Sequence, residues 1–261
     1  MVLAGVSQSA RMPRMEMIMT ATVAFVLAGF VKGVLGFGFP IIALVVLTLT
    51  IGLLDALALI VIPTLVTNFW QAVSGPYLRP ILSRMWLYFT LAMLGIIFAS
   101  QYLATANAEL LTAFLGIILF AFSLSRIFNL HITVPPKREP LLSVLLGSVN
   151  GVITGLTGTF MVPSVLYMQA LGFSKDMLVQ AMGVFFGLST LMLTISLGRN
   201  GLISAHEAGL STVALLPSLA GVYLGRWTRR QIDEDRFQRL FLYAVLALGA
   251  YLVWRSARNL L

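Results

Sequence analysis

The chain has 261 residues, of which 59% are hydrophobic and only 10% are charged. An average soluble domain carries about 25% charged residues, so this composition excludes a water-soluble fold. Cysteine is absent, which excludes disulfides, thiolate nucleophiles and cysteine-based metal sites. The formal charge of +8 does not indicate a nucleic-acid partner, because the basic residues lie between apolar runs, where they fix orientation in a membrane.

The N-terminal region has the outline of a signal peptide. Arg11 and Arg14 precede the apolar stretch Met17–Val31. No small-x-small cleavage site follows, and the apolar character resumes after Lys32. We therefore expect a tail over residues 1–14 and a retained first membrane helix.

Uncharged runs predict the later membrane segments, because about 20 apolar residues span a bilayer. The first half contains Met17–Val31, Gly33–Leu54, Ala56–Leu78, Met85–Ala108 and Leu110–Ser125. The second half contains Leu141–Ser174, which is too long for one upright helix and divides near Gly158, and then Met177–Gly198, Ala208–Gly225 and Leu240–Trp254. The expected fold is an all-α transmembrane bundle of roughly eight to ten segments. Its expected parts are a first repeat (15–128), a polar loop (129–140) and a second repeat (141–261).

A self-match indicates that the two halves are homologous repeats. Three glycines recur at identical spacing, Gly29, Gly33 and Gly36 over Gly151, Gly155 and Gly158. Such spacing places small residues on one helical face, where another backbone can approach closely. Simple helix packing explains any single glycine equally well.

Each glycine motif continues toward a proline, through Gly38 to Pro40 and through Thr159 to Pro163. Glycine and proline break helices, and a break at membrane depth survives only where protein or a water-filled cavity surrounds it. We expect short helices over Ile41–Leu53 and from near Pro163. Transporters use such paired breaks to build an anion site at the midplane.

These residues resemble the sulfite exporter TauE/SafE family, whose halves each begin with a G-x-x-x-G-x-x-G-x-G stretch followed by proline. The segment Ile62–Gln71 also looks like the family's second characteristic stretch. Phe37, Phe39 and Thr159-Phe160 stand where members commonly have glycines. The resemblance implies export of sulfite or organosulfonates through a bacterial cytoplasmic membrane.

The candidate substrate-binding residues are polar or glycine residues of these segments. They are Lys32, Gly33, Gly36, Gly38, Asn68, Gln71, Asn150, Thr154, Gly155, Thr157, Gly158, Thr159 and Ser189. Lys32 would be the counter-charge, or a lysine whose ammonium reaches the interface. Asn68, Gln71 and Ser189 would donate to substrate oxygens, or join helices by hydrogen bonds. The threonines could instead bond their own helix carbonyls.

Other features predict structural roles. We expect Asp55 and Asp176 to cap the helices that follow, although either could accept a proton in coupling. His131 and His206 are expected in loops, and no metal or cofactor is expected. The tryptophans are expected to be interfacial anchors. They are Trp70, Trp86, Trp227 and Trp254.

Lysine and arginine are enriched in the loops of one side, around Arg79, Arg126–Arg138, Lys175 and Arg226–Arg239. The positive-inside rule makes this side cytoplasmic and both termini non-cytoplasmic.

The function expected is alternating-access transport of a small anion, with membrane lipid around the chain and a coupling proton or ion left open. Another organic anion as substrate, a passive channel, an intramembrane enzyme and a structural membrane subunit are the alternatives. A non-enzyme is favoured because no predicted helix carries paired carboxylates or a histidine. The sequence is also compatible with a homo-oligomer.

Overall fold

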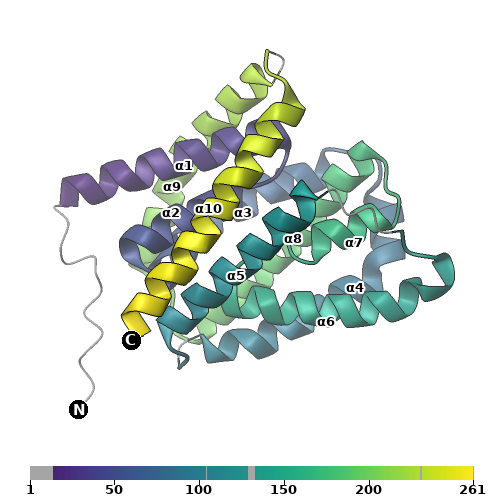
Figure 1. Cartoon of the computed structure of the whole chain (residues 1–261), viewed down its shortest axis with the longest axis horizontal. Coiled ribbons are helices and arrows are strands. Elements are labelled where there is room, and N and C mark those ends of the chain that lie inside the picture. Colours follow the sequence, from purple (N-terminus) through teal and green to yellow (C-terminus); the bar gives the residue numbers. More distant parts are fainter. Residues whose placement is uncertain (1–13, 104, 129–132, 230, 261) are drawn as a thin grey trace.

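The computed structural model describes residues 14–103, 105–128, 133–229 and 231–260. Residues 1–13 of the predicted tail and His131 therefore lie outside the described residues. Within them the chain is helical (Figure 1). The α-helices are α1 (Arg14–Leu35), α2 (Phe39–Ile51), α3 (Leu53–Val73), α4 (Leu78–Ala99), α5 (Ala108–Ile127), α6 (Glu139–Thr157), α7 (Ser164–Ala170), α8 (Lys175–Arg199), α9 (Ala205–Thr228) and α10 (Glu234–Leu260).

Eight of the described helices are long and apolar enough to cross a membrane. The two others, α2 and α7, are the short helices that follow the glycine motifs. This confirms the predicted all-α transmembrane fold with helices broken at glycine and proline. The helix α6 begins at Glu139, inside the range predicted as the polar loop between the halves.

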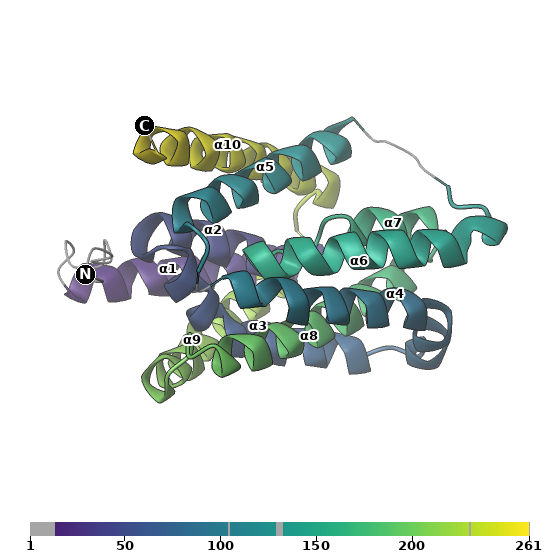
Figure 2. The ribbon, with the colours of Figure 1, turned by 90° about the horizontal axis from the view of Figure 1, so that it is seen from below.

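Each half has the same order of elements, one long helix, one short helix and three long helices. The helix pairs follow the same plan. The first helix of each half packs on the fourth helix of the other, giving the pairs α1 with α9 and α6 with α4. The third helices, α3 and α8, pack on each other, as do the fifth, α5 and α10, which lie side by side at the top of Figure 2. That the halves are homologous repeats stays a prediction.

The two broken helices point toward opposite ends of the bundle. Gly33 of α1 lies against Arg226 of α9, so the two C-terminal ends meet. The end of α6 instead lies beside the end of α4, because Gly155 faces Ser100. Since a short loop turns α3 back into α4, the end of α4 is the end at which α3 begins. The breaks after α1 and α6 therefore approach the interior from opposite sides.

Backbone approach explains the spacing of the glycines within the helices. A Cβ on Gly29 would lie 2.2 Å from the carbonyl oxygen of Ser218, and one on Gly33 would lie 2.4 Å from that of Val222. Across the other pair, a Cβ on Gly151 would lie 2.3 Å from the carbonyl oxygen of Ala92. Packing therefore accounts for these glycines, as small-xxx-small contacts do in membranes.

Three helix starts differ from the predictions. Asp55 is not a cap, because α3 begins at Leu53 after Gly52, whose missing side chain can make no capping bond. Asp176 is not a cap either, since the Ser174 hydroxyl accepts the bond at the start of α8. Both carboxylates lie in the first turn, where the helix dipole favours them. His206 is not in a loop, because the Ser204–Glu207 capping box starts α9 one residue earlier.

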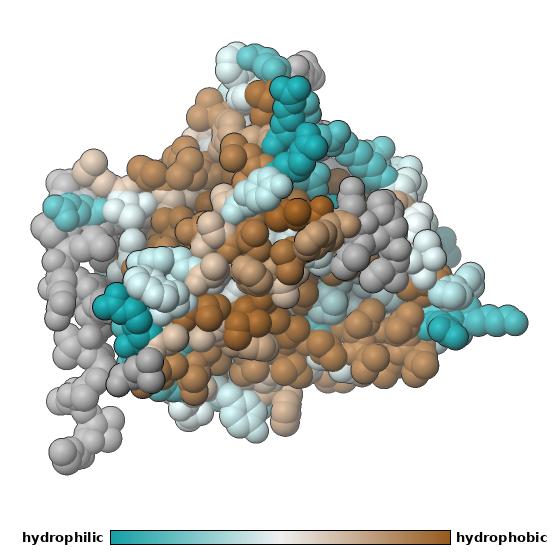
Figure 3. Space-filling model, in the orientation of Figure 1, coloured by the Kyte–Doolittle hydropathy of each residue, from teal (hydrophilic) through white to brown (hydrophobic). Residues whose placement is uncertain are grey.

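The surface carries a broad apolar region with polar ends. Figure 3 shows hydrophilic residues where α9 meets α10 and at the far end of α6, and again near the C-terminal end of α10, with hydrophobic residues between these regions. The four tryptophans are more than half exposed, as interfacial anchors are.

Candidate functional site

The site begins where α1 is interrupted. Gly36 and Gly38 have left-handed backbones, with φ of 80° and 94°. Only glycine adopts these angles without strain, and Pro40 then lies in the first turn of α2. The chain thus reverses at the end of α1, and Lys32 lies one turn before the reversal.

Lys32 is buried and bonded to a residue of another helix. Its side chain is only 7% exposed, and its Nζ donates a hydrogen bond to Oδ1 of the fully buried Asn68 on α3. The ammonium therefore does not reach the interface. No acidic side chain of the described residues forms an ion pair with Lys32. A buried cation without a counter-charge is costly and is stabilised by an anion.

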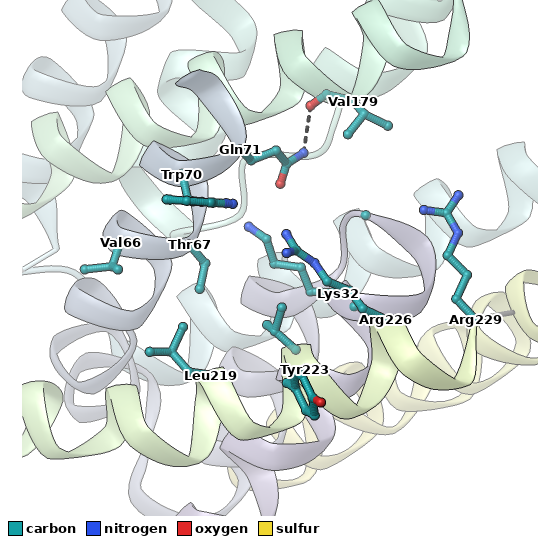
Figure 4. A pocket seen from close by; sticks show the side chains of 13 residues that line it. Lys32, Val66, Thr67, Trp70, Gln71, Val179, Leu219, Tyr223, Arg226 and Arg229 are labelled. Carbon is teal, nitrogen blue, oxygen red and sulfur yellow. Dashed lines mark hydrogen bonds between the residues drawn. The ribbon is translucent and has the colours of Figure 1, made fainter. Parts of the chain in front are cut away.

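A second cation lies beside Lys32. In Figure 4 the guanidinium of Arg226, from the end of α9, lies next to the Lys32 ammonium, whereas Arg229 points away. Arg226 has no ion-pair partner among the residues that the structure describes. Sequence reasoning assigned Arg226 to a charged loop, because the apolar run ends at Gly225. The signal that was available is the Gly221–Gly225 spacing, which repeats the spacing of Gly29 and Gly33.

These cations line a cavity of about 490 Å³ between α1, α3, α8 and α9. Polar contacts fix its wall, since Gln71 Nε2 donates to the carbonyl oxygen of Val179 at 2.7 Å and Thr67 Oγ1 donates to that of Pro63 at 2.8 Å. The lining residues are Lys32, Gly33, Gly36, Val66, Thr67, Trp70, Gln71, Val179, Leu219, Val222, Tyr223, Arg226 and Arg229. Two cations in a largely apolar wall can hold one anion and fix its orientation.

The cavity continues toward the end of the bundle where α3 and α9 finish. An adjoining hollow of about 450 Å³ shares Trp70, Gln71 and Arg226 with it. This hollow extends over residues 74–77 to Lys175 and Asp176 at the start of α8. A continuous depression thus links the buried Lys32 ammonium to the end of the bundle whose loops are rich in lysine and arginine.

The polar residues of the second half form a separate cluster around the break after α6. Thr154 Oγ1 lies 3.1 Å from Oδ1 of Asn150 and 3.0 Å from the carbonyl oxygen of Thr159. Thr157 Oγ1 donates to its own helix and accepts from the Thr159 amide. Gly158, with φ of 70°, ends the helix. These bonds satisfy the backbone that the break exposes.

The two clusters do not meet around one point. Asn68 of α3 lies beside Gly187 of α8, whereas Gly158 faces Leu57 and Leu193. Asn68 and Leu57 are separated along α3 by about 16 Å at 1.5 Å per residue. The structure therefore brings Lys32, Asn68 and Gln71 together, and places the candidates around the break after α6 nearer the other end. Ser189 does not belong to that second cluster, because it lies on α8 two residues from Gly187, which packs on Asn68.

Buried polar atoms without partners lie on α3 and α8. They include Nδ2 of Asn68, Oγ1 of Thr64 and Oγ of Ser189. Thr159 Oγ1, beside the second break, is also without a partner. An unsatisfied buried polar group costs about 1–3 kcal/mol, so such groups are uncommon in an interior that is never hydrated.

Gly155 is a packing residue in this structure. A Cβ there would lie 2.8 Å from the Ala99 Cβ and 2.9 Å from the Ile96 carbonyl oxygen. Gly33 both packs on α9 and contributes backbone to the cavity. Among the described residues no group of three or more His, Cys, Asp or Glu could hold a metal ion.

Apolar helices with charged ends, interrupted at glycine and surrounding a buried cation, define a multi-pass integral membrane protein. The chain belongs to the Sulfite exporter TauE/SafE family, whose model matches residues 21–252, and it is a membrane transporter of that family. No curated protein and no solved structure matches the chain.

Proposed function

We propose that this transporter exports small sulfur-containing anions, such as sulfite or organosulfonates, by alternating access. The observation that carries the proposal is the buried ammonium of Lys32, held by Asn68 and without an acidic partner among the described residues. A sulfonate or sulfite supplies the missing negative charge, and its oxygens accept hydrogen bonds from Lys32 and Arg226.

The direction is argued from the position of the cavity. The hollow leads to the side that the arginine and lysine pattern makes cytoplasmic, so the anion is taken up from the cytosol. The opposed breaks after α1 and α6 support a second state that opens on the other side. In that state the anion would leave past Thr154 and Thr159.

Transport in proteoliposomes tests the proposal. Radiolabelled sulfite or taurine is trapped inside, and efflux is followed for the wild type, Lys32→Gln and Arg226→Gln. We expect Lys32→Gln to abolish saturable efflux, and Arg226→Gln to raise the KM at least about fivefold, since an exposed cation contributes less than a buried one. Arg199→Gln, at the other end of the bundle, is the matched control.

The same experiment separates the alternatives. Saturable efflux of a carboxylate instead of sulfur anions would support a carrier whose substrate is a carboxylate. Flux that does not saturate would indicate a channel. No flux of any anion, in protein that melts cooperatively, would leave a structural subunit or an enzyme acting on lipid.

A further inference from the structure

The cavity at Lys32 is much larger than an inorganic oxyanion. It measures about 490 Å³, within the range of pockets that enclose organic molecules. Sulfite consists of one sulfur and three oxygens, so it would occupy only the region next to the two cations. The remaining volume has room for a ligand with a further group.

The distribution of the lining side chains shows what kind of group this is. The cations Lys32 and Arg226 lie together on one side of the cavity (Figure 4). Most of the remaining wall is apolar or aromatic, with Trp70 of α3 and Leu219 of α9 among its residues. Its polar members are Thr67, Gln71 and Arg229, and Arg229 points away from the Lys32 ammonium. Such a wall gains free energy by removing apolar ligand surface from water. A ligand that is polar throughout would leave this gain unused.

The apolar wall is continuous with the outer surface of α3 and α9. Trp70 is 60% exposed and Tyr223 is 73% exposed, and both also line the cavity. Exposed faces of membrane-spanning helices contact lipid, so the apolar end of a ligand would lie beside the acyl chains. The anionic end would remain at Lys32, away from lipid.

We propose that the site selects amphipathic organic anions, in which a sulfonate or similar oxyanion head is joined to an apolar alkyl or aryl body. The head binds Lys32 and Arg226, and the body lies against Trp70 and Leu219. This inference rests on the proposed function, because it assumes that the anion binds at Lys32.

Binding of a homologous series tests the inference. Dissociation constants are measured by calorimetry for sulfite and for the linear alkanesulfonates from methanesulfonate to pentanesulfonate, with the protein in lipid nanodiscs. Empty nanodiscs correct for partition into lipid. Burial of each methylene is worth about 0.8 kcal/mol, so we expect the Kd to fall about fourfold per added methylene.

Two variants assign the effect to this cavity. Trp70→Ala should reduce the gain per methylene to less than about twofold, whereas Trp86→Ala, an exposed tryptophan of α4 away from the cavity, should leave it unchanged. Lys32→Gln should weaken every member of the series by a similar factor, because all share the anionic head.

The outcomes separate this inference from the function on which it rests. A Kd that is equal for sulfite and pentanesulfonate, with binding abolished by Lys32→Gln, would overturn the amphipathic ligand and keep the anion site. A gain per methylene that survives Trp70→Ala would also overturn it. Binding that does not depend on Lys32 would overturn both proposals.

Discussion

Lys32 of α1 and Asn68 of α3 lie 36 residues apart in the chain and share a hydrogen bond in the interior. The Asn68 oxygen accepts from the ammonium, while its Nδ2 is buried and has no hydrogen-bond partner. The asparagine therefore holds the cation without neutralising it, which preserves the positive charge for a ligand.

Substitutions at Asn68 should distinguish two properties of this residue. It accepts a hydrogen bond from the Lys32 ammonium, and it leaves the positive charge of Lys32 free to bind an anion. Asn68→Asp places a carboxylate beside the ammonium, so we expect anion affinity to fall more than about tenfold without loss of thermal stability. Asn68→Leu leaves the buried ammonium without its acceptor and should cost about 1–3 kcal/mol of stability. Calorimetric binding and thermal melting measure both effects. Wild-type affinity in Asn68→Asp would contradict the role of Lys32 as the anion's counter-charge.

The close contact of α1 with α9 predicts that Gly33 does not tolerate a side chain. Gly33→Ala places a Cβ 2.4 Å from the Val222 carbonyl oxygen and 2.8 Å from the Arg226 amide nitrogen. We expect a loss of about 1–3 kcal/mol, seen as a lower melting temperature in detergent. Gly209→Ala is the matched control, since a Cβ there meets nothing within 4 Å and should stabilise α9 by about 0.5–1 kcal/mol. Equal melting temperatures for both variants would refute the packing role.

A serine of α9 replaces the helix hydrogen bond that a proline of α3 removes. Pro63 has no N–H for the Leu59 carbonyl oxygen, and Ser211 Oγ donates to that oxygen at 2.7 Å. Ser211→Ala should therefore destabilise the protein by about 1 kcal/mol. Pro63→Ala in the same chain restores the N–H and should recover much of that loss.

A double-mutant cycle of melting temperatures measures this compensation. Thr212→Ala is the control, because the Thr212 hydroxyl bonds only within α9. Additive effects of Ser211→Ala and Pro63→Ala would show that the Ser211 hydroxyl does not compensate for the N–H that Pro63 lacks.

The absence of cysteine allows a direct test of topology. Single cysteines at Lys137 and Thr105, both exposed, lie at opposite ends of the bundle. The arginine and lysine pattern predicts that a membrane-impermeant maleimide added to whole cells labels Thr105→Cys and not Lys137→Cys. Labelling after lysis provides the control for reactivity. The reverse labelling pattern would show that the protein has the opposite orientation, with the Lys32 cavity open to the outside of the cell.

The pattern of the sequence was enough to locate the membrane segments and their breaks. Uncharged runs identified the long helices, although boundaries moved where a charge lies inside a helix. Lys32 was expected to end a segment, but α1 continues to Leu35. The charge of Lys32 is tolerated inside the helix because the Lys32 ammonium is bonded to Asn68 and is not exposed to lipid. The predicted caps at Asp55 and Asp176 were wrong because the N-cap residues of α3 and α8 are Gly52 and Ser174.

The site was only partly accessible to the same reasoning. Lys32, Asn68 and Gln71 were candidates because polar residues are rare in apolar segments, and the structure brings these three together. Arg226 was missed because it follows the apolar run directly, and the Gly221–Gly225 spacing that points to close packing of this helix on α1 was not used. Thr154 and Thr159 were candidates for the same site, and they lie in another cluster.

Membrane spanning, the course of the helices and the two breaks follow from local features, because run length, glycine and proline act on their own stretch of chain. The pairing of the helices depends on contacts between distant segments and became known from the three-dimensional arrangement. Close backbone contact at Gly33 and Gly225 places Arg226 beside Lys32. The opposed directions of α1 and α6 hold the second cluster apart. Such contacts between distant segments depend on packing that no local pattern specifies.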